Sequence, residues 1–148
     1  QNLIRLSFLG QKCCDTELIS NAIENVNLDI FNTARNWLDR YFIGENPDIK
    51  EIRLKLSGTE FQLAVWDVLK EISFGKTKTY GEIAKLLKNK FNGKNFSAQA
   101  VGGAISRNPI LIIVPCHRVI GSNGKLVGYS GGVEIKRKLL EFEKKFIY

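Results

Sequence analysis

The sequence of 148 residues contains no methionine, a single histidine and only three cysteines. Two of the cysteines, Cys13 and Cys14, are adjacent, and no CxxC pair occurs, so the pattern predicts neither a disulfide framework nor a zinc site. Free thiols are typical of proteins in a reducing compartment. The missing methionine at position 1 indicates an N-terminus that was processed or cut away.

Long apolar runs are also missing from the chain. No segment approaches the ~20 apolar residues that a membrane span needs, and the first residues, QNLIRL, lack the charged and then apolar pattern of a signal peptide. We therefore expect a soluble intracellular protein with no membrane partner. With 44% hydrophobic residues, the chain can bury a core of ordinary size, as one domain or as a small subdomain attached to a larger one.

Acidic residues are fewer than basic ones. The chain has 22 Lys and Arg against 15 Asp and Glu, which gives a net charge of +7. One interpretation is a polyanionic partner such as nucleic acid, and the other is a basic globular protein that binds no polyanion.

The first third of the chain predicts a small sheet-plus-helix unit. Residues 3–10, LIRLSFLG, alternate apolar and polar side chains before a glycine, which is typical of a strand. Between residues 15 and 42, apolar residues recur at spacings of three and four, which indicates helices. The window 44–52, GENPDIKEI, gathers Gly, Asn, Pro and charge, so we place the boundary there, between residues 1–50 and residues 51–148.

The second unit is predicted to be mainly helical. Thr59 and Gln62 have the spacing of a capping box at the start of a helix. Thr79 and Glu82 repeat this spacing, which places Tyr80 in the first turn of the next helix.

A third short helix follows a basic loop rich in Asn and Gly. Ser97 can cap a helix over residues 98–107, which must end at Asn108 because Pro109 follows. Two short helices joined in this way can present the second one to a DNA groove, and two helices of a bundle are an equally good alternative. The outward side of the second helix would consist of Gln99, Ala100, Gly103 and Arg107.

The only histidine directly follows a cysteine in the segment ILIIVPCHRVI, residues 110–120. The apolar run 110–114 predicts a buried strand, and Pro115 rigidifies the approach to Cys116 and His117. A Cys-His dipeptide alone is a weak indication of a nucleophile, so the chemistry depends on what else lies near it.

Glu143 lies in the last predicted helix among apolar neighbours. The residues three and four positions away are Leu139, Leu140, Phe146 and Ile147. The carboxylate is therefore expected against the core, where it needs a partner. His117 and Arg118 are equal candidates: with Arg118 the pair would be structural, whereas with His117 the carboxylate would orient the ring, and the other ring nitrogen could take the thiol proton of Cys116 directly or through a water.

Five ordered motifs closely resemble one family, the O6-alkylguanine-DNA alkyltransferases, also called methylated-DNA–protein-cysteine methyltransferases. The motifs are GTEFQLAVW (58–66), TYGEIA (79–84), AVGGAISRNP (100–109), PCHRVI (115–120) and GYSGG (128–132). The resemblance runs from about Ser57 to Glu143, and NWLDRYFIGENP (36–47) also resembles the end of the family's N-terminal domain.

The resemblance implies an α+β fold of two domains. Residues 1–50 would belong to a small, ribonuclease-H-like domain of sheet and helix, and its first strands are expected to be missing because residues 3–10 resemble a later strand. Residues 51–148 would form the DNA-binding and alkyl-acceptor domain, mainly helical, with a winged-helix-like helix-turn-helix and an active-site loop.

The resemblance also implies DNA repair by direct reversal, without a cofactor. An O6-alkylguanine, or alternatively an O4-alkylthymine, would be flipped out of duplex DNA, and its alkyl group would pass irreversibly to Cys116, once per molecule. His117, a bridging water and Glu143 would activate the thiol. Tyr80 would rotate the target's backbone and assist protonation of the departing guanine, and Asn108 would be the hinge between the recognition helix and the active-site turn.

By the same resemblance, the pocket walls are Val119, Tyr129, Ser130 and Gly131. The DNA contacts, in the minor groove, are Tyr80, Gln99, Ala100, Gly103, Arg107 and Ser122. Gln99 replaces an arginine that many members insert beside the flipped base. Some members bind zinc through Cys and His in the N-terminal domain, but with one histidine we expect no metal. We expect a monomer in the cytoplasm, associated with DNA in a nucleoid or nucleus.

Two other functions use part of the same sequence. A cysteine hydrolase would need the same Cys, His and acid but would turn over many times. A non-catalytic alkyl-lesion-binding DNA protein would keep the helices and the basic charge without needing Cys116, and the lesion sensors of the family lack that cysteine.

Overall fold

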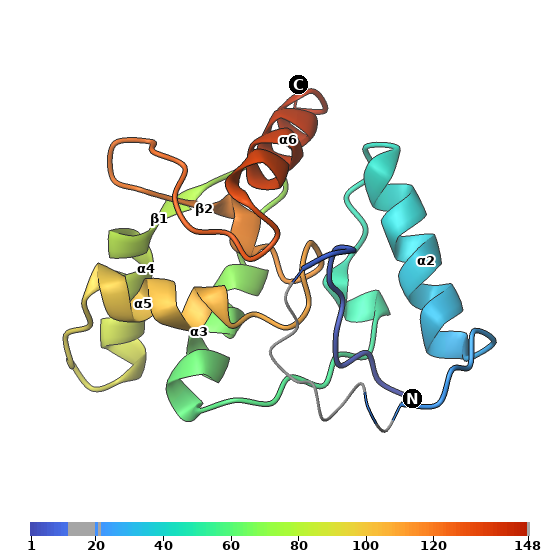
Figure 1. Ribbon diagram of the computed structural model, residues 1–148. Helices are drawn as coiled ribbons and strands as arrows, with labels where there is room; N and C mark the ends of the chain where they lie inside the picture. The colour runs from blue at the N-terminus through green and yellow to red at the C-terminus, as the bar shows by residue number, and fades with distance from the viewer. Residues whose placement is uncertain (12–19, 21, 148) are drawn as a thin grey trace.

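The computed structural model describes residues 1–11, 20 and 22–147 (Figure 1). Five α-helices have their bounds within these residues: α2 (Asp29–Phe42), α3 (Glu60–Lys70), α4 (Tyr80–Lys90), α5 (Ala98–Ser106) and α6 (Val133–Lys144). Two short 3₁₀ helices are η1 (Ile49–Glu51) and η2 (Cys116–Arg118). Strand β1 (Lys78–Thr79) pairs in parallel with β2 (Val119–Ile120), so the described chain contains both α and β structure, with little sheet.

Helices α3, α4 and α5 pack against one another and form the left-hand part of the molecule in Figure 1. Each helix turns an apolar face inward, as the predicted periodicity requires. The most completely buried residues of these faces are Val65, Leu69, Ile83, Leu87 and Val101. This three-helix core supports the chain segments that carry the candidate site.

The three predicted helix starts are confirmed. The Thr59 and Gln62 side chains bond each other's backbone N–H groups at the start of α3, and Thr79 and Glu82 do the same at α4. Ser97 accepts a hydrogen bond from the backbone of α5 over 3.1 Å. Because Thr79 is the cap, Tyr80 is the first residue of α4, as predicted.

The N-terminal segment is extended, but it forms only isolated bridges. Leu3 pairs with Leu54 and Leu6 pairs with Ile110, both in parallel. The predicted strand at 3–10 is therefore reduced to two isolated bridges with residues of the second predicted unit, 51–148. The helical prediction for residues 15–42 is confirmed over α2 and wrong for residues 22–28, which are not helical. Residues 12–19 and 21, with both adjacent cysteines, lie outside the described part.

The prediction of a strand at residues 110–114 is wrong, although their burial is as expected. The backbone turns here: the Ile113 amide donates to the Leu111 carbonyl over 2.8 Å, and the Val114 amide donates to the Ile110 carbonyl over 3.1 Å. Ile112 has a φ of 68°, which is rare for a β-branched residue. A continuous apolar run shows that a segment is buried but does not separate a strand from a buried turn.

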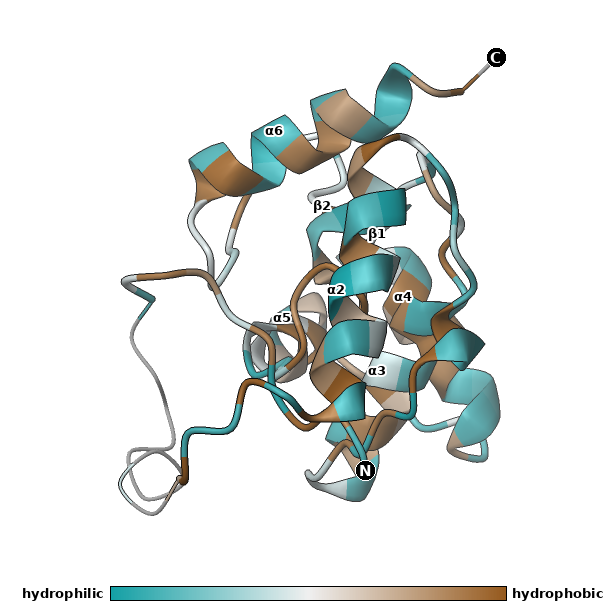
Figure 2. Ribbon diagram, turned by 90° about the vertical axis from the view of Figure 1, so that its right-hand side faces the viewer, coloured by the Kyte–Doolittle hydropathy of each residue, from teal (hydrophilic) through white to brown (hydrophobic). Residues whose placement is uncertain are grey.

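Helix α2 forms the right-hand side of the molecule in Figure 1, and its C-terminal end, with Tyr41, contacts α6. Its buried residues are Ile30, Ala34, Trp37 and Tyr41, at spacings of four, three and four. The opposite side of α2 is largely hydrophilic, as Figure 2 shows. One face of this N-terminal helix is therefore part of the core and the other meets solvent.

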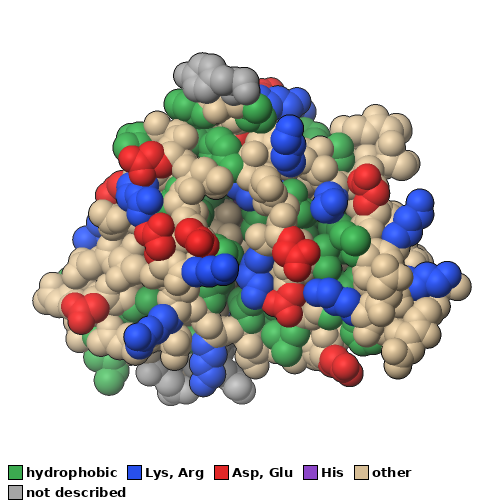
Figure 3. Space-filling model, turned by 180° about the vertical axis from the view of Figure 1, so that it is seen from behind, with side chains coloured by type: hydrophobic (Ala, Val, Ile, Leu, Met, Phe, Trp, Pro, Cys, Tyr) green, Lys and Arg blue, Asp and Glu red, His purple; other side chains and the backbone are tan. Residues whose placement is uncertain are grey.

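The surface seen from behind carries both signs of charge. Lys and Arg side chains are interspersed with Asp and Glu across this face in Figure 3, so the net positive charge is not concentrated there. Among the described residues, no helix has the length and apolar character needed to cross a membrane.

The capping box of α3 gives the first prediction. Replacing Thr59 with alanine leaves the N–H of Gln62 without its acceptor and should lower the free energy of unfolding by roughly 1 kcal/mol. Urea denaturation measures this difference. The exposed Thr77 serves as the matched control, because Thr77→Ala removes the same atoms outside any helix and should change stability much less; an equal loss in both variants would contradict the role of the cap.

Candidate active site

Cys116 and His117 begin η2, directly after the buried turn at 110–114. Both side chains are almost fully buried, with exposed fractions of 2% and 0%. The Cys116 amide donates to the Val114 carbonyl over 2.8 Å, which closes the turn beneath the sulfur. The thiol therefore has a fixed position and little contact with water.

Asn108 fixes the sulfur from the end of α5. Its Nδ2 donates to the Val114 carbonyl over 2.8 Å and to Cys116 Sγ over 3.1 Å, and its Oδ1 accepts from the Ile110 amide over 3.0 Å. One buried side-chain amide thus connects α5, the turn and the thiol. Asn108 was predicted to be a hinge at this point of the chain, and that role stays a prediction.

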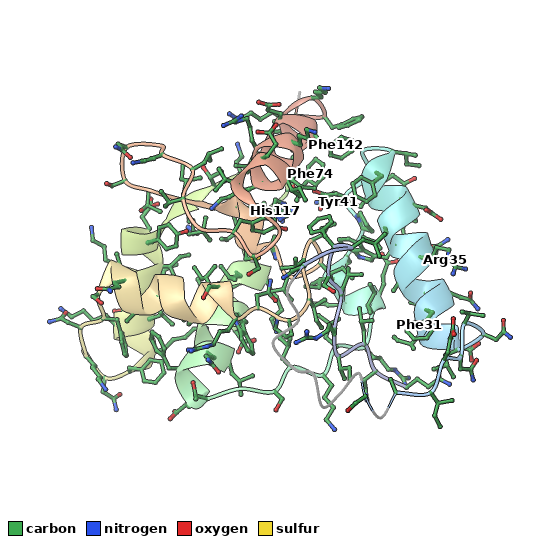
Figure 4. The ribbon with its side chains drawn as sticks, in the orientation of Figure 1. Phe31, Arg35, Tyr41, Phe74, His117 and Phe142 are labelled. Carbon is green, nitrogen blue, oxygen red and sulfur yellow. The ribbon has the colours of Figure 1, made fainter. Side chains whose placement is uncertain are left out.

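Glu143 of α6 is completely buried and accepts hydrogen bonds from four residues. His117 Nε2 lies 2.7 Å from Oε1, and the Tyr41 hydroxyl donates to the same oxygen over 2.8 Å. Arg118 contacts both oxygens at 2.9–3.1 Å, and the Gly75 amide donates to Oε2 over 2.8 Å. The two partners that the sequence left open, His117 and Arg118, therefore both bind the carboxylate, and Figure 4 shows Tyr41 and His117 close together between α2 and α6.

These donors keep Glu143 ionised. Burial alone would raise its pKa, but the hydrogen bonds from His117 and Arg118 outweigh burial and hold the pKa at about 2. An ionised carboxylate only accepts hydrogen bonds, so the proton of the neutral imidazole lies on Nε2. Nδ1 is then the basic nitrogen, and it is buried with no partner among the described residues.

Both groups that would exchange a proton are neutral at rest. Burial raises the pKa of the Cys116 thiol to about 11, although the hydrogen bond from Asn108 acts against this shift. Burial also lowers the pKa of His117, against the effect of Glu143. A thiolate at Cys116 therefore has to be generated during a reaction, and an adjacent base such as Nδ1 is needed for it.

Lys136 is a buried cation that the sequence analysis missed. Its Nζ donates to the Val127 carbonyl over 2.9 Å and lies 5.9 Å from the ring of Tyr80. Burial lowers its pKa to about 8, whereas the nearby Cys116 raises it. A helical signal was present, because Lys136 precedes Glu143 by two helical turns on the same face of α6.

The predicted pocket residues come from β2, directly after η2, and from the loop before α6. Val119 is buried at the start of β2, and the Tyr129 ring lies 6.5 Å from the His117 ring, with a buried hydroxyl that has no partner among the described residues. The Ser130 hydroxyl donates to the carbonyl of Ser106, at the end of α5, over 2.8 Å. The structure thus brings the loop before α6 and the C-terminal end of α5 together.

Gly131 occupies a position where a side chain does not fit. A Cβ atom at this residue would lie 2.7 Å from the Phe8 ring and 2.8 Å from the Tyr129 ring. The absence of a side chain allows the N-terminal segment and the loop to approach closely. Tyr80 meets the same loop from α4, where its hydroxyl donates to the Val127 carbonyl over 3.0 Å.

Five of the six predicted DNA contacts are exposed, on α5, at its C-cap and in one surface turn, whereas the sixth, Tyr80, is half-buried at the start of α4. The exposed residues are Gln99, Ala100, Gly103, Arg107 and Ser122. The opposite side of α5 is buried against α3 and α4, as the predicted amphipathic pattern requires.

The bonds to Glu143 predict a dependence of stability on pH. Because the folded state lowers the pKa of Glu143 from 4.5 to about 2, the unfolded chain binds more protons between these values. The stability that the ionised group contributes is present above the higher value and is lost toward the lower one, by an amount on the order of 3 kcal/mol. Urea denaturation from about pH 6 to about pH 2.5 measures this loss.

Two variants separate Glu143 from the other acids. Glu143→Gln should be less stable near neutral pH, because Arg118 loses its buried partner, but its stability should fall less on acidification. Glu60→Gln removes an exposed carboxylate of α3, and its free energy of unfolding should change with pH as in the wild type. If the free energy of unfolding changed equally with pH in all three proteins, the lowered pKa of Glu143 would be contradicted.

Known proteins are similar to this chain both in sequence and in structure. Residues 60–145 match the family model of the 6-O-methylguanine DNA methyltransferase DNA-binding domain. A methylated-DNA–protein-cysteine methyltransferase of Methanosarcina acetivorans is 51% identical over 117 residues, which cover 79% of this chain and 71% of that protein. Its counterpart in Methanosarcina barkeri is 45% identical over 145 residues, covering 97% of this chain and 85% of that protein.

A solved structure resembles almost the whole chain. The crystal structure of Mycobacterium tuberculosis OGT in complex with DNA superposes with a TM-score of 0.81 at 42% identity, covering 97% of this chain and 81% of that chain. The motifs, the site and these similarities agree. The chain belongs to the 6-O-methylguanine DNA methyltransferase family, the methylated-DNA–protein-cysteine methyltransferases, as its sequence predicts.

Proposed function

We propose that this protein repairs DNA by direct reversal, moving the alkyl group of an O6-alkylguanine to Cys116. The observation that carries the proposal is a buried thiol beside a histidine whose Nε2 is fixed by an ionised carboxylate. Family membership supports the reaction class, which is methyl transfer from DNA to a protein cysteine. DNA is therefore the partner, with a base alkylated at O6 of guanine or, as a second substrate, O4 of thymine.

The chemistry is a displacement at the alkyl carbon. The thiol proton of Cys116 passes to His117 Nδ1, directly or through a water, and Sγ attacks the carbon. The bond from that carbon to O6 breaks as the sulfur–carbon bond forms, and guanine leaves with the electron pair of the broken bond. Guanine takes up a proton with the help of Tyr80, and His117 gives up the proton that it took from the thiol, so the products are a thioether, neutral guanine and a neutral imidazole.

The surroundings of the sulfur favour this charge transfer. Asn108 Nδ2 can donate to the thiolate, and the nearby Lys136 lowers the pKa of Cys116. Glu143 stabilises the imidazolium that forms at His117, while Arg118 keeps the carboxylate ionised. A thioether does not hydrolyse under ordinary conditions, so each molecule acts once, and the reaction as written needs no cofactor.

A base inside a duplex cannot reach a thiol that is 2% exposed, so the target nucleotide must leave the stack. We infer that Val119, Tyr129, Ser130 and Gly131 line the pocket for the flipped base. Glycine at 131 lets the backbone approach the guanine edge, and Tyr80 lies between this loop and α5.

The DNA surface is proposed to be a winged-helix-like helix-turn-helix formed by α4 and α5. Small residues on the exposed side of α5 suit insertion into the minor groove, where little sequence information is read. The contacts would be Tyr80, Gln99, Ala100, Gly103, Arg107 and Ser122. We propose that the protein acts as a monomer in the cytoplasm, on DNA of a nucleoid or nucleus.

The division into two domains, residues 1–50 and 51–148, is also a proposal. The turn and η1 at residues 44–51 support a boundary there, between α2 and the helical core. The first unit would be the ribonuclease-H-like domain of the family. The two units share contacts, because Leu6 pairs with Ile110 and Tyr41 binds Glu143.

The alternative of a non-catalytic lesion-binding protein is not favoured. Such a protein has no use for a thiol held by Asn108 beside a polarised histidine. A cysteine hydrolase would use the same three groups, and it would be recognised by product that exceeds one equivalent.

A mass measurement tests the proposed function. After incubation with excess duplex that carries one O6-methylguanine, the intact protein should gain one CH₂ unit, and the gain should stop at one per molecule. Cys116→Ser should gain no mass and should still bind the duplex. DNA binding by the wild type without a mass gain would establish the lesion-binding alternative, and continued product formation would establish a hydrolase.

The glutamine at position 99 gives a second test on DNA. Gln99→Arg places a positive charge on the exposed side of α5, so binding to the lesion duplex should tighten, and the slope of log affinity against log salt should steepen by about one. Asn36→Arg is the matched control, because it adds the same charge on α2, across the molecule from α5 (Figure 1). Equal effects of the two variants would contradict the assignment of α5 to the DNA surface.

A further inference from the structure

Tyr41 belongs to the segment 36–47, which the reaction proposed above does not use. Its hydroxyl donates to Glu143 Oε1 over 2.8 Å, across 102 positions of sequence. Tyr41 is 1% exposed and Glu143 is 0% exposed, so water does not compete for this bond. A residue of the N-terminal helix α2 therefore reaches the carboxylate that orients His117.

The Tyr41 ring is held from several sides. The Trp37 ring stacks on it at 5.7 Å and 10°, and the rings of Phe74 and Phe142 lie at 5.7 Å on its other sides (Figure 4). Trp37 is itself anchored, because its indole N–H donates to the Asp48 carbonyl over 3.1 Å. The hydroxyl direction is thus set by packing and is not free to turn to another acceptor.

The two oxygens of Glu143 are held differently. Arg118 donates to both oxygens, and among the described residues Oε2 otherwise receives only the Gly75 amide, which lies outside the proposed proton path. Oε1 is the oxygen that meets His117 Nε2, and Tyr41 is its only neutral donor among the described residues apart from that imidazole. Loss of the hydroxyl would therefore act on the oxygen in contact with the histidine.

We propose that Tyr41 is a positioning residue for alkyl transfer. Its hydroxyl fixes Glu143 Oε1 opposite His117 Nε2, so that Nδ1 faces the thiol in the tautomer that accepts a proton. Helix α2 is then part of the activating relay and not only a covering element. The inference rests on the proposed function, because it assigns a role within that reaction.

The test uses Tyr41→Phe in the full chain, which keeps the ring and removes only the hydroxyl. The rate of methyl transfer is measured in a single turnover with saturating O6-methylguanine duplex, and the affinity for the duplex is measured separately. We expect transfer to slow roughly three- to tenfold, the effect of losing one buried hydrogen bond, with the affinity unchanged.

Phe42→Leu is the matched control. Phe42 contacts the rings of Tyr41 and Phe142, at 5.0 and 5.9 Å, without a bond to Glu143. Phe42 is 49% exposed, so Phe42→Leu trims the outer side of the ring cluster and leaves the Trp37 stack and the Tyr41 hydroxyl in place. Transfer by this variant should stay close to the wild-type rate.

The single histidine supplies a readout that does not depend on activity. Protein labelled with ¹⁵N-histidine gives the signals of one imidazole, which report the tautomer and the hydrogen bond of His117. The Nε2–H resonance should move in Tyr41→Phe and stay unchanged in Phe42→Leu.

The outcomes separate this inference from the proposed function. If the wild-type protein gains no methyl group, the proposed function fails whatever the histidine signals show. If the wild type transfers the group, slower transfer together with a moved resonance supports the role of Tyr41. An unchanged rate, or a slower rate with an unmoved resonance, overturns it, because the hydroxyl would then stabilise the fold only.

Discussion

The structure depends on a negative charge placed where water cannot reach it. Glu143 is fully buried, and an ion in that position costs several kcal/mol unless its lone pairs are occupied. Three segments supply hydrogen-bond donors to this carboxylate of α6: α2 through Tyr41, the loop through Gly75, and η2 through His117 and Arg118. Segments that are distant in the sequence are thereby fixed to one another and to the thiol.

The negative charge of Glu143 also serves the reaction, because His117 and Arg118 both bind the carboxylate. Arg118 forms the ion pair and keeps Glu143 ionised, which leaves the imidazole of His117 neutral with its proton on Nε2. A histidine paired with a free carboxylate would be more basic and would gain its proton before substrate arrives. Binding of Glu143 by both Arg118 and His117 therefore suits a site whose imidazole and thiol must stay neutral until an alkylated base is in place.

The sequence predicts the local features of this protein better than its distant contacts. Capping spacings locate the starts of α3, α4 and α5, because a cap and its partner lie three residues apart. The burial of Glu143 follows from its helical neighbours. The turn at residues 110–114 does not follow, because five apolar residues carry no sign of the reversal, which Asn108 stabilises by its hydrogen bonds although Ile112 has to adopt a positive φ. For Tyr41 the helical periodicity predicts only that the side chain is buried, since a periodic pattern does not show where a hydroxyl points.

The two-residue ladder between β1 and β2 is short, but it connects the start of α4 to the end of η2. Lys78 pairs with Val119 and Thr79 with Ile120, so β1 ends one residue before Tyr80 and β2 begins one residue after Arg118. The ladder sets the register between α4 and the turn that holds the thiol. A slip of one residue would displace one relative to the other by about 3.3 Å, the rise of a strand residue. Changes of loop length are therefore tolerable in the exposed turns at 92–95 and 122–125, and far less so in the segments that enter this ladder.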